Sequence, residues 1–209
     1  ETSDQSCIIG HKSAKHLKDD EFSIISHSLG SRIVMDGMHD IAERVTEVAQ
    51  GDTSSAESQF ITAFQNKQIP FYLMSNQIPL LEMGEEPPEV IGKADAYCLP
   101  GGEHYDKRLV KKTSIMAFSD PNDLLSYGIP QEFVQNYLDS RLCAEVTNIN
   151  INVAHVMDLF GMGKFANPLT AHTGYDSDDR VVALIAKGIG TKHTADIVTE
   201  RCKWTEYID

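Results

Sequence analysis

The sequence predicts an α/β protein with a mostly parallel sheet flanked by helices. Short apolar runs alternate along the chain with longer helical patterns, as in layered folds with parallel strands. No apolar run approaches the roughly 18 residues that a bilayer-spanning helix needs. The 209 residues are 41% hydrophobic and 23% charged, which fits a single globular domain over residues 1–209 and excludes a disordered chain.

Four apolar runs are expected to form parallel strands: residues 22–26, 69–74, 113–118 and 146–153. The first three are short runs bounded by turn residues, as expected of strands buried on both faces. The fourth run alternates Ile149 and Ile151 with Asn148 and Asn150, so one of its faces is more polar. This alternation predicts a place near an edge of the sheet.

Five segments have helical patterns: residues 7–18, 29–50, 58–65, 130–142 and 176–189. In the second segment, apolar residues such as Val34, Met38 and Ile41 recur every three or four positions, and Gly51 is a plausible stop. The last segment opens with acidic capping residues and ends near Gly188 and Gly190. Residues 94–106 contain Pro100-Gly101-Gly102 and are expected to be irregular.

The composition restricts partners and cofactors. The chain has 18 basic and 31 acidic residues, a net charge of −13, so it is unsuited to nucleic acid and to anionic membrane surfaces. The four cysteines, which are Cys7, Cys98, Cys143 and Cys202, have no metal-ligand spacing, so no zinc site is expected. We expect unpaired thiols, with two disulfides as the alternative. The sequence does not determine the cellular compartment, although it favours the cytoplasm.

The most informative segment for function is residues 22–38, a strand, a tight turn and a long helix. Ser28 lies on the turn, where its hydroxyl is exposed above the ends of the parallel strands. Ser26 and Gly30, two residues to either side, are small enough to let the strand and the helix approach closely. Ser28 is therefore a candidate nucleophile, and an ordinary turn with a serine N-cap is the alternative.

A nucleophilic serine needs a base and a carboxylate that orients the base. Asp120 and Asp123 both follow the third strand, where ligands bind in open parallel sheets; we favour Asp123 as the acid and Asp120 as a turn residue. His172 follows the last strand and is our candidate base, with His155 as its competitor. His27 is expected to pack beside the site.

With these residues, the chain resembles the α/β-hydrolase superfamily, and within it the lipases and esterases. Residues 26–33, 76–81, 117–127 and 171–175 carry the resemblance. It implies Ser28 as nucleophile, His172 as general base and then acid, Asp123 as orienting acid, and the N–H of Leu29 as one oxyanion donor. It also implies that the substrate is an ester or lipid and that the reaction needs neither a cofactor nor a metal.

Two features depart from the superfamily pattern. Gly is replaced by Ser26 in the nucleophile motif, and only 27 residues precede Ser28, where several strands and a Gly-rich oxyanion loop are usual. We therefore expect a domain that lacks its N-terminal strands, with an upstream segment or a partner chain completing the sheet. The main alternative function is a catalytically inactive or partner-completed binding module, and acyl transfer is a minor third.

Overall fold

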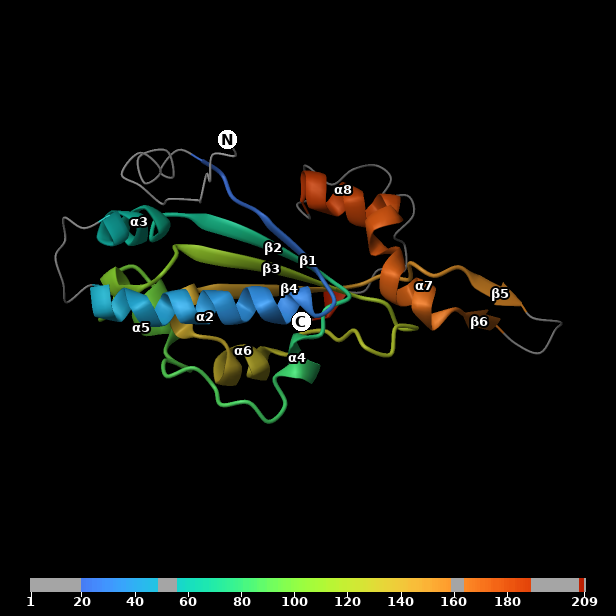
Figure 1. Ribbon diagram of the computed structural model, residues 1–209, viewed down its shortest axis with the longest axis horizontal. Helices are drawn as coiled ribbons and strands as arrows, with labels where there is room; N and C mark the ends of the chain where they lie inside the picture. The colour runs from blue at the N-terminus through green and yellow to red at the C-terminus, as the bar shows by residue number, and fades with distance from the viewer. Residues whose placement is uncertain (1–19, 49–55, 159–163, 189–206, 209) are drawn as a thin grey trace, which may run out of the picture.

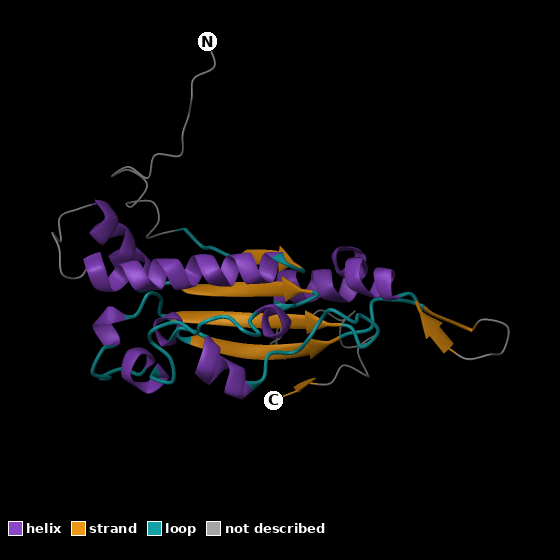
Figure 2. Ribbon diagram, turned by 60° about the horizontal axis from the view of Figure 1, so that its bottom comes forward, coloured by secondary structure: helices purple, strands orange, loops and turns teal. Residues whose placement is uncertain are grey.

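A five-stranded sheet forms the centre of the computed structural model, which describes residues 20–48, 56–158, 164–188 and 207–208 (Figure 1). The strand order is β1-β2-β3-β4-β7. Four strands are parallel: β1 (Ile24–His27), β2 (Gln68–Met74), β3 (Lys112–Ser119) and β4 (Ala144–Asn150). Their arrowheads point the same way in Figure 2, and β7 (Tyr207–Ile208) pairs antiparallel with β4. The predicted α/β class with a mostly parallel sheet is confirmed.

Helices cover both faces of this sheet. Successive residues of β2 show it: Phe71 and Leu73 pack in one core cluster, whereas Tyr72 and Met74 pack in another. The first cluster includes α2 (Gly30–Val48), with α3 (Ala56–Phe64) and α6 (Gln131–Tyr137) packed around it. The second includes α8 (Asp179–Lys187). Because side chains alternate along a strand, a run that is apolar at every position requires this two-sided cover.

The segment predicted as one helix over residues 130–142 is two elements. Helix α6 ends at Tyr137, Leu138 is extended, and a short 3-10 helix, η2 (Ser140–Leu142), follows. The cause is Asp139, whose carboxylate accepts the backbone N–H of Arg141 at 2.8 Å and also binds its guanidinium, with both side chains buried. A local Asp–backbone bond of this kind competes with helix continuation.

The carboxyl end of β4 also differs from the prediction. The strand ends at Asn150, because the carboxylate of Asp120 accepts the N–H groups of Val153 and Ala154 at 2.7 and 3.2 Å and draws the chain away from the sheet. A hairpin that sequence analysis missed follows, formed by β5 (Val156–Asp158) and β6 (Lys164–Ala166).

Several short helical elements lie outside the strand runs. Residues 94–106, predicted to be irregular, contain α5 (Ala94–Cys98) and η1 (Tyr105–Lys107), and the segment after β2 forms α4 (Ile78–Leu81). Helix α7 (Pro168–Thr173) begins with Pro168, and the side chain of Asn167 accepts the N–H of Leu169 at 2.9 Å. Helix α8 is capped by Asp178 and is followed by Gly188, close to its predicted bounds.

The expectation of unpaired thiols is wrong for two of the cysteines. Cys98 and Cys143 form a disulfide with a Cα–Cα distance of 5.4 Å. Spacing along the chain could not show this, because α5 and η2, which Cys143 follows, come together only in the folded domain. Several predictions fall outside the described residues: the helix over residues 7–18, the stop at Gly51, and residues 189–190 at the predicted end of the last helix. Cys7 and Cys202 also lie outside them. Among the described helices, none has the length and apolar character needed to cross a membrane.

Candidate active site

The predicted functional side chains meet at the carboxyl edge of the sheet. Ser28 directly follows β1, Asp123 lies in the loop after β3, and His172 lies in the last turn of α7. Figure 1 shows α7 at this end of the strands, beside the point where β1 turns into α2. The structure thus brings together three residues that span 144 positions of the chain, from Ser28 to His172.

The turn that carries Ser28 is tight. Ser28 has a φ of 55°, in the left-handed region, and its N–H donates to the carbonyl of Met74 at 2.9 Å. Its own carbonyl accepts the N–H and the hydroxyl of Ser31, which lies in the first turn of α2. A Cβ added at Gly30 would lie 3.4 Å from the Cβ of Ser26, so the two small residues do allow the close approach predicted for them. Left-handed serines are uncommon and cluster at functional sites.

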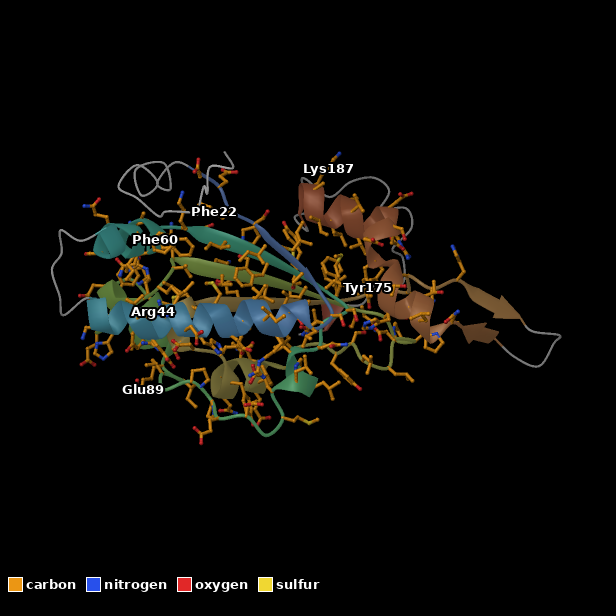
Figure 3. All side chains as sticks on the ribbon, viewed as in Figure 1. Phe22, Arg44, Phe60, Glu89, Tyr175 and Lys187 are labelled. Carbon is orange, nitrogen blue, oxygen red and sulfur yellow. A yellow bond between two sulfur atoms is a disulfide. The ribbon has the colours of Figure 1, made fainter. Side chains whose placement is uncertain are left out.

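His172 lies between the hydroxyl of Ser28 and the carboxylate of Asp123. Its Nε2 is 3.0 Å from Ser28 Oγ, and its Nδ1 is 3.1 Å from each carboxylate oxygen of Asp123. A second contact holds the helix in place, since Nε2 of His27 donates to the carbonyl of His172 at 2.7 Å. The His27 ring packs against His172 and the buried Tyr175, which lies beside the strand ends (Figure 3).

The two aspartates after β3 have different environments. The side chain of Asp123 is 1% exposed and faces His172. Asp120 instead accepts hydrogen bonds from Asn122 within its own turn and from the backbone that follows β4. This is the division of roles proposed from the sequence: Asp123 faces the histidine, and Asp120 shapes the loop that carries Asp123.

Sequence analysis missed Ser75, which belongs to the same cluster. This residue directly follows β2, is fully buried, and has a left-handed φ of 49°. Its hydroxyl donates to Oδ2 of Asp123 at 2.6 Å and lies 2.9 Å from Nδ1 of His172. The sequence shows only that Ser75 comes directly after a predicted strand, and the order of the strands in the sheet is what places it beside the nucleophile strand.

Hydrogen bonds keep the carboxylate of Asp123 in its charged form. Burial acts to raise its pKa, but the hydroxyl of Ser75, the N–H of Leu125 and the ring of His172 outweigh burial and hold the pKa below its usual value. The Leu125 N–H lies 3.0 Å from Oδ1. A charged carboxylate favours the tautomer that carries its proton on Nδ1, which leaves Nε2 free to accept a proton from Ser28.

The other candidates from the sequence have separate positions. His155 is exposed in the segment after β4 and forms no hydrogen bond with Ser28 within the described part of the chain. The backbone N–H of Leu29, the expected oxyanion donor, has no hydrogen-bond partner among the described residues. An N–H at this place is available to a developing negative charge beside Ser28. No group of three metal-ligating side chains is found within the described ranges.

Comparison with known proteins adds no relative. No protein-family model matches this chain, and no curated protein and no solved structure matches it either.

Proposed function

We propose that the protein is a serine hydrolase that cleaves carboxylic esters or lipids. One observation carries the proposal: Ser28 Oγ lies 3.0 Å from Nε2 of His172, and Asp123 lies on the other ring nitrogen. Nucleophile, base and orienting acid are recognised by this geometry rather than by their positions in a sequence. The left-handed turn under Ser28 supports it, because strained backbone at the nucleophile is typical of such turns.

The reaction follows from these contacts. Nε2 of His172 takes the hydroxyl proton as Ser28 Oγ attacks the ester carbonyl carbon, and the Leu29 N–H donates to the resulting oxyanion. The intermediate collapses, the alcohol leaves with the proton from His172, and the acyl group stays on Ser28. A water molecule then loses a proton to His172 and attacks the acyl-enzyme, and the Ser28 oxygen leaves with that proton as the acid is released. Asp123 stabilises the imidazolium at both stages without itself taking the proton.

The order of the elements supports an α/β-hydrolase-like fold. The serine follows β1, the aspartate follows β3, and the histidine comes after β4, which is the chain order of that superfamily. Among the described strands, the one that carries Ser28 is at the edge of the sheet, and its residue Ile25 is 53% exposed. We propose that a further strand, from an upstream segment or a partner chain, pairs with β1 and supplies the second oxyanion donor.

The surface around the site supports an uncharged, apolar substrate. Six exposed apolar side chains lie within four residues of Ser28, Asp123 or His172: Ile25, Leu29, Leu124, Leu125, Tyr127 and Leu169. The segments 121–131 and 166–175 contain Asp123 as their only Asp, Glu, Lys or Arg, whereas 21 residues at the chain's average of 23% would hold about five. This uncharged rim favours long acyl chains over anionic or cationic esters.

The proposal is tested with Ser28→Ala against Ser23→Ala, a matched change at an exposed serine just before β1. We expect Ser28→Ala to lower kcat on p-nitrophenyl esters by a factor on the order of 10⁶ and to abolish labelling by a fluorophosphonate probe. Ser23→Ala should keep both. Wild-type hydrolysis by Ser28→Ala would exclude the mechanism.

The open edge of β1 favours one competing function, a partner-completed or inactive binding module. In that case the wild-type chain alone would not react with the probe. A module completed by a partner would gain labelling at Ser28 when the partner is added, whereas an inactive module would stay unlabelled.

A further inference from the structure

Ser28 and Ser75 occupy matching positions on neighbouring strands. His27 and Met74 are paired in the parallel register of β1 and β2, and each serine directly follows one of them. Both serines have a left-handed backbone, with φ values of 55° and 49°. Residues other than Gly, Asn and Asp rarely adopt this backbone conformation. Its repetition therefore indicates that the chain bends at both strand ends so that the two hydroxyls point to the same place. That place is the ring of His172, which has Ser28 at Nε2 and Ser75 at Nδ1.

The hydroxyl of Ser75 has one proton, and its contacts determine where this proton points. Asp123 Oδ2 is 2.6 Å from Ser75 Oγ and is acceptor-only as a carboxylate, so the hydroxyl donates to it. The lone pairs of Oγ then face Nδ1 of His172 at 2.9 Å, closer than either carboxylate oxygen at 3.1 Å. The Nδ1–H therefore has Ser75 as its nearest acceptor. The carboxylate of Asp123 contacts this N–H directly and also accepts the Ser75 hydroxyl.

We propose that Ser75 is a positioning residue that bridges the acid and the base, accepting from His172 and donating to Asp123. The proposal rests on the proposed hydrolase function. The hydroxyl holds the imidazole in the tautomer and orientation in which Nε2 faces Ser28, and it supplies one donor to a carboxylate that is almost inaccessible to solvent. Ser75 touches neither the substrate nor the reacting atoms, so it acts through His172 and Asp123.

The test compares Ser75→Ala and Ser75→Gly with Ser140→Ala. Ser140 is a buried serine beside the amino end of β4, where its hydroxyl accepts the N–H of Lys93, so it controls for the loss of any buried hydroxyl. Glycine adopts the left-handed backbone freely, so Ser75→Gly keeps the proposal testable where Ser75→Ala fails to fold. Losing a hydrogen bond to a charged group predicts a kcat lower by about 10- to 100-fold, with KM nearly unchanged.

The titration of Asp123 supplies a readout that a merely structural role would not move. The Ser75 hydroxyl is one of the bonds that hold the pKa of Asp123 below its usual value. Without it the pKa rises, so the carboxyl carbon of Asp123, followed by NMR, titrates at a higher pH in both Ser75 variants. The Asp123 titration in Ser140→Ala stays where it is in the wild type.

A proton NMR measurement separates this proposal from the proposed function. The His172 Nδ1–H, assigned by its loss in His172→Gln, should shift or broaden in both Ser75 variants and stay in place in Ser140→Ala. An unchanged resonance or an unmoved Asp123 titration in the Ser75 variants would overturn the bridging role, even where kcat falls, because a fall alone indicates a structural role. If the wild type hydrolyses no ester, the proposed function fails, and the resonance still decides whether Ser75 bridges the pair.

Discussion

The Cys98–Cys143 disulfide should contribute a large share of the stability of this domain. The two cysteines are 45 positions apart, and the bond ties the end of α5 to the start of β4. In the chain-entropy model a loop of this length lowers the entropy of the unfolded chain by about 13 cal/mol/K, or about 4 kcal/mol at 25 °C. For a domain of this size each kcal/mol changes Tm by about 2–4 °C, so reduction should lower Tm by about 8–16 °C.

The assay is thermal unfolding followed by circular dichroism, with and without a phosphine reductant. Cys98→Ser should melt like the reduced wild type, and reductant should not lower its Tm further. Activity measured well below Tm should survive reduction, because the disulfide lies at the amino end of β4 and the site lies at the carboxyl ends of the strands. A fall in Tm of less than about 2 °C on complete reduction, or a peptide map without the Cys98–Cys143 link, would refute this reasoning.

Two further predictions concern the site. Asp123→Asn should lower kcat by about 10⁴ in a well-folded protein, since the imidazole then adopts the wrong tautomer. Asp120→Asn should mainly lower the free energy of unfolding, by about 0.5–3 kcal/mol. If Asp120→Asn is instead the folded but inactive variant, the two roles are reversed. Leu124→Glu should raise KM for long-chain p-nitrophenyl esters more than for the acetate, whereas Leu99→Glu, an exposed leucine next to the disulfide, should leave both unchanged. Equal effects of the two substitutions would show that the uncharged rim does not contact the acyl chain.

The strands and long helices could be predicted from the sequence because their signals are local. A run that is apolar on both faces, such as residues 69–74, allows few structures other than a buried strand, and α2 has a regular apolar stripe. The errors occur where one distant contact decides the backbone. The carboxylate of Asp120, which lies in another loop, ends β4. Cys98 of α5 bonds to Cys143, which is 45 positions further along the chain.

Three members of the site could be predicted because each follows a recognisable strand, turn or loop. Ser75 could not, since Met74-Ser75-Asn76 contains neither a motif nor a charge. Its importance depends on the register between β1 and β2, which places it level with Ser28, and on a left-handed backbone that the serine side chain does not reveal. Once a nucleophile strand is known, the polar residue directly after the neighbouring parallel strand is therefore a candidate partner of the base.

The two edges of the sheet differ in a way that bears on the whole proposal. On one side, the antiparallel strand β7 covers β4. On the other side, β1 has no described neighbour beyond it, and residues 22–31 contain no Lys, no Pro and no charge. Natural edge strands are commonly protected by such residues or by a covering element, because an unpaired apolar edge recruits other strands. Since Ser28 lies at the end of this strand, the segment that pairs with β1 would bring its own backbone N–H groups next to the nucleophile. We therefore expect that the segment that completes the sheet also completes the oxyanion site.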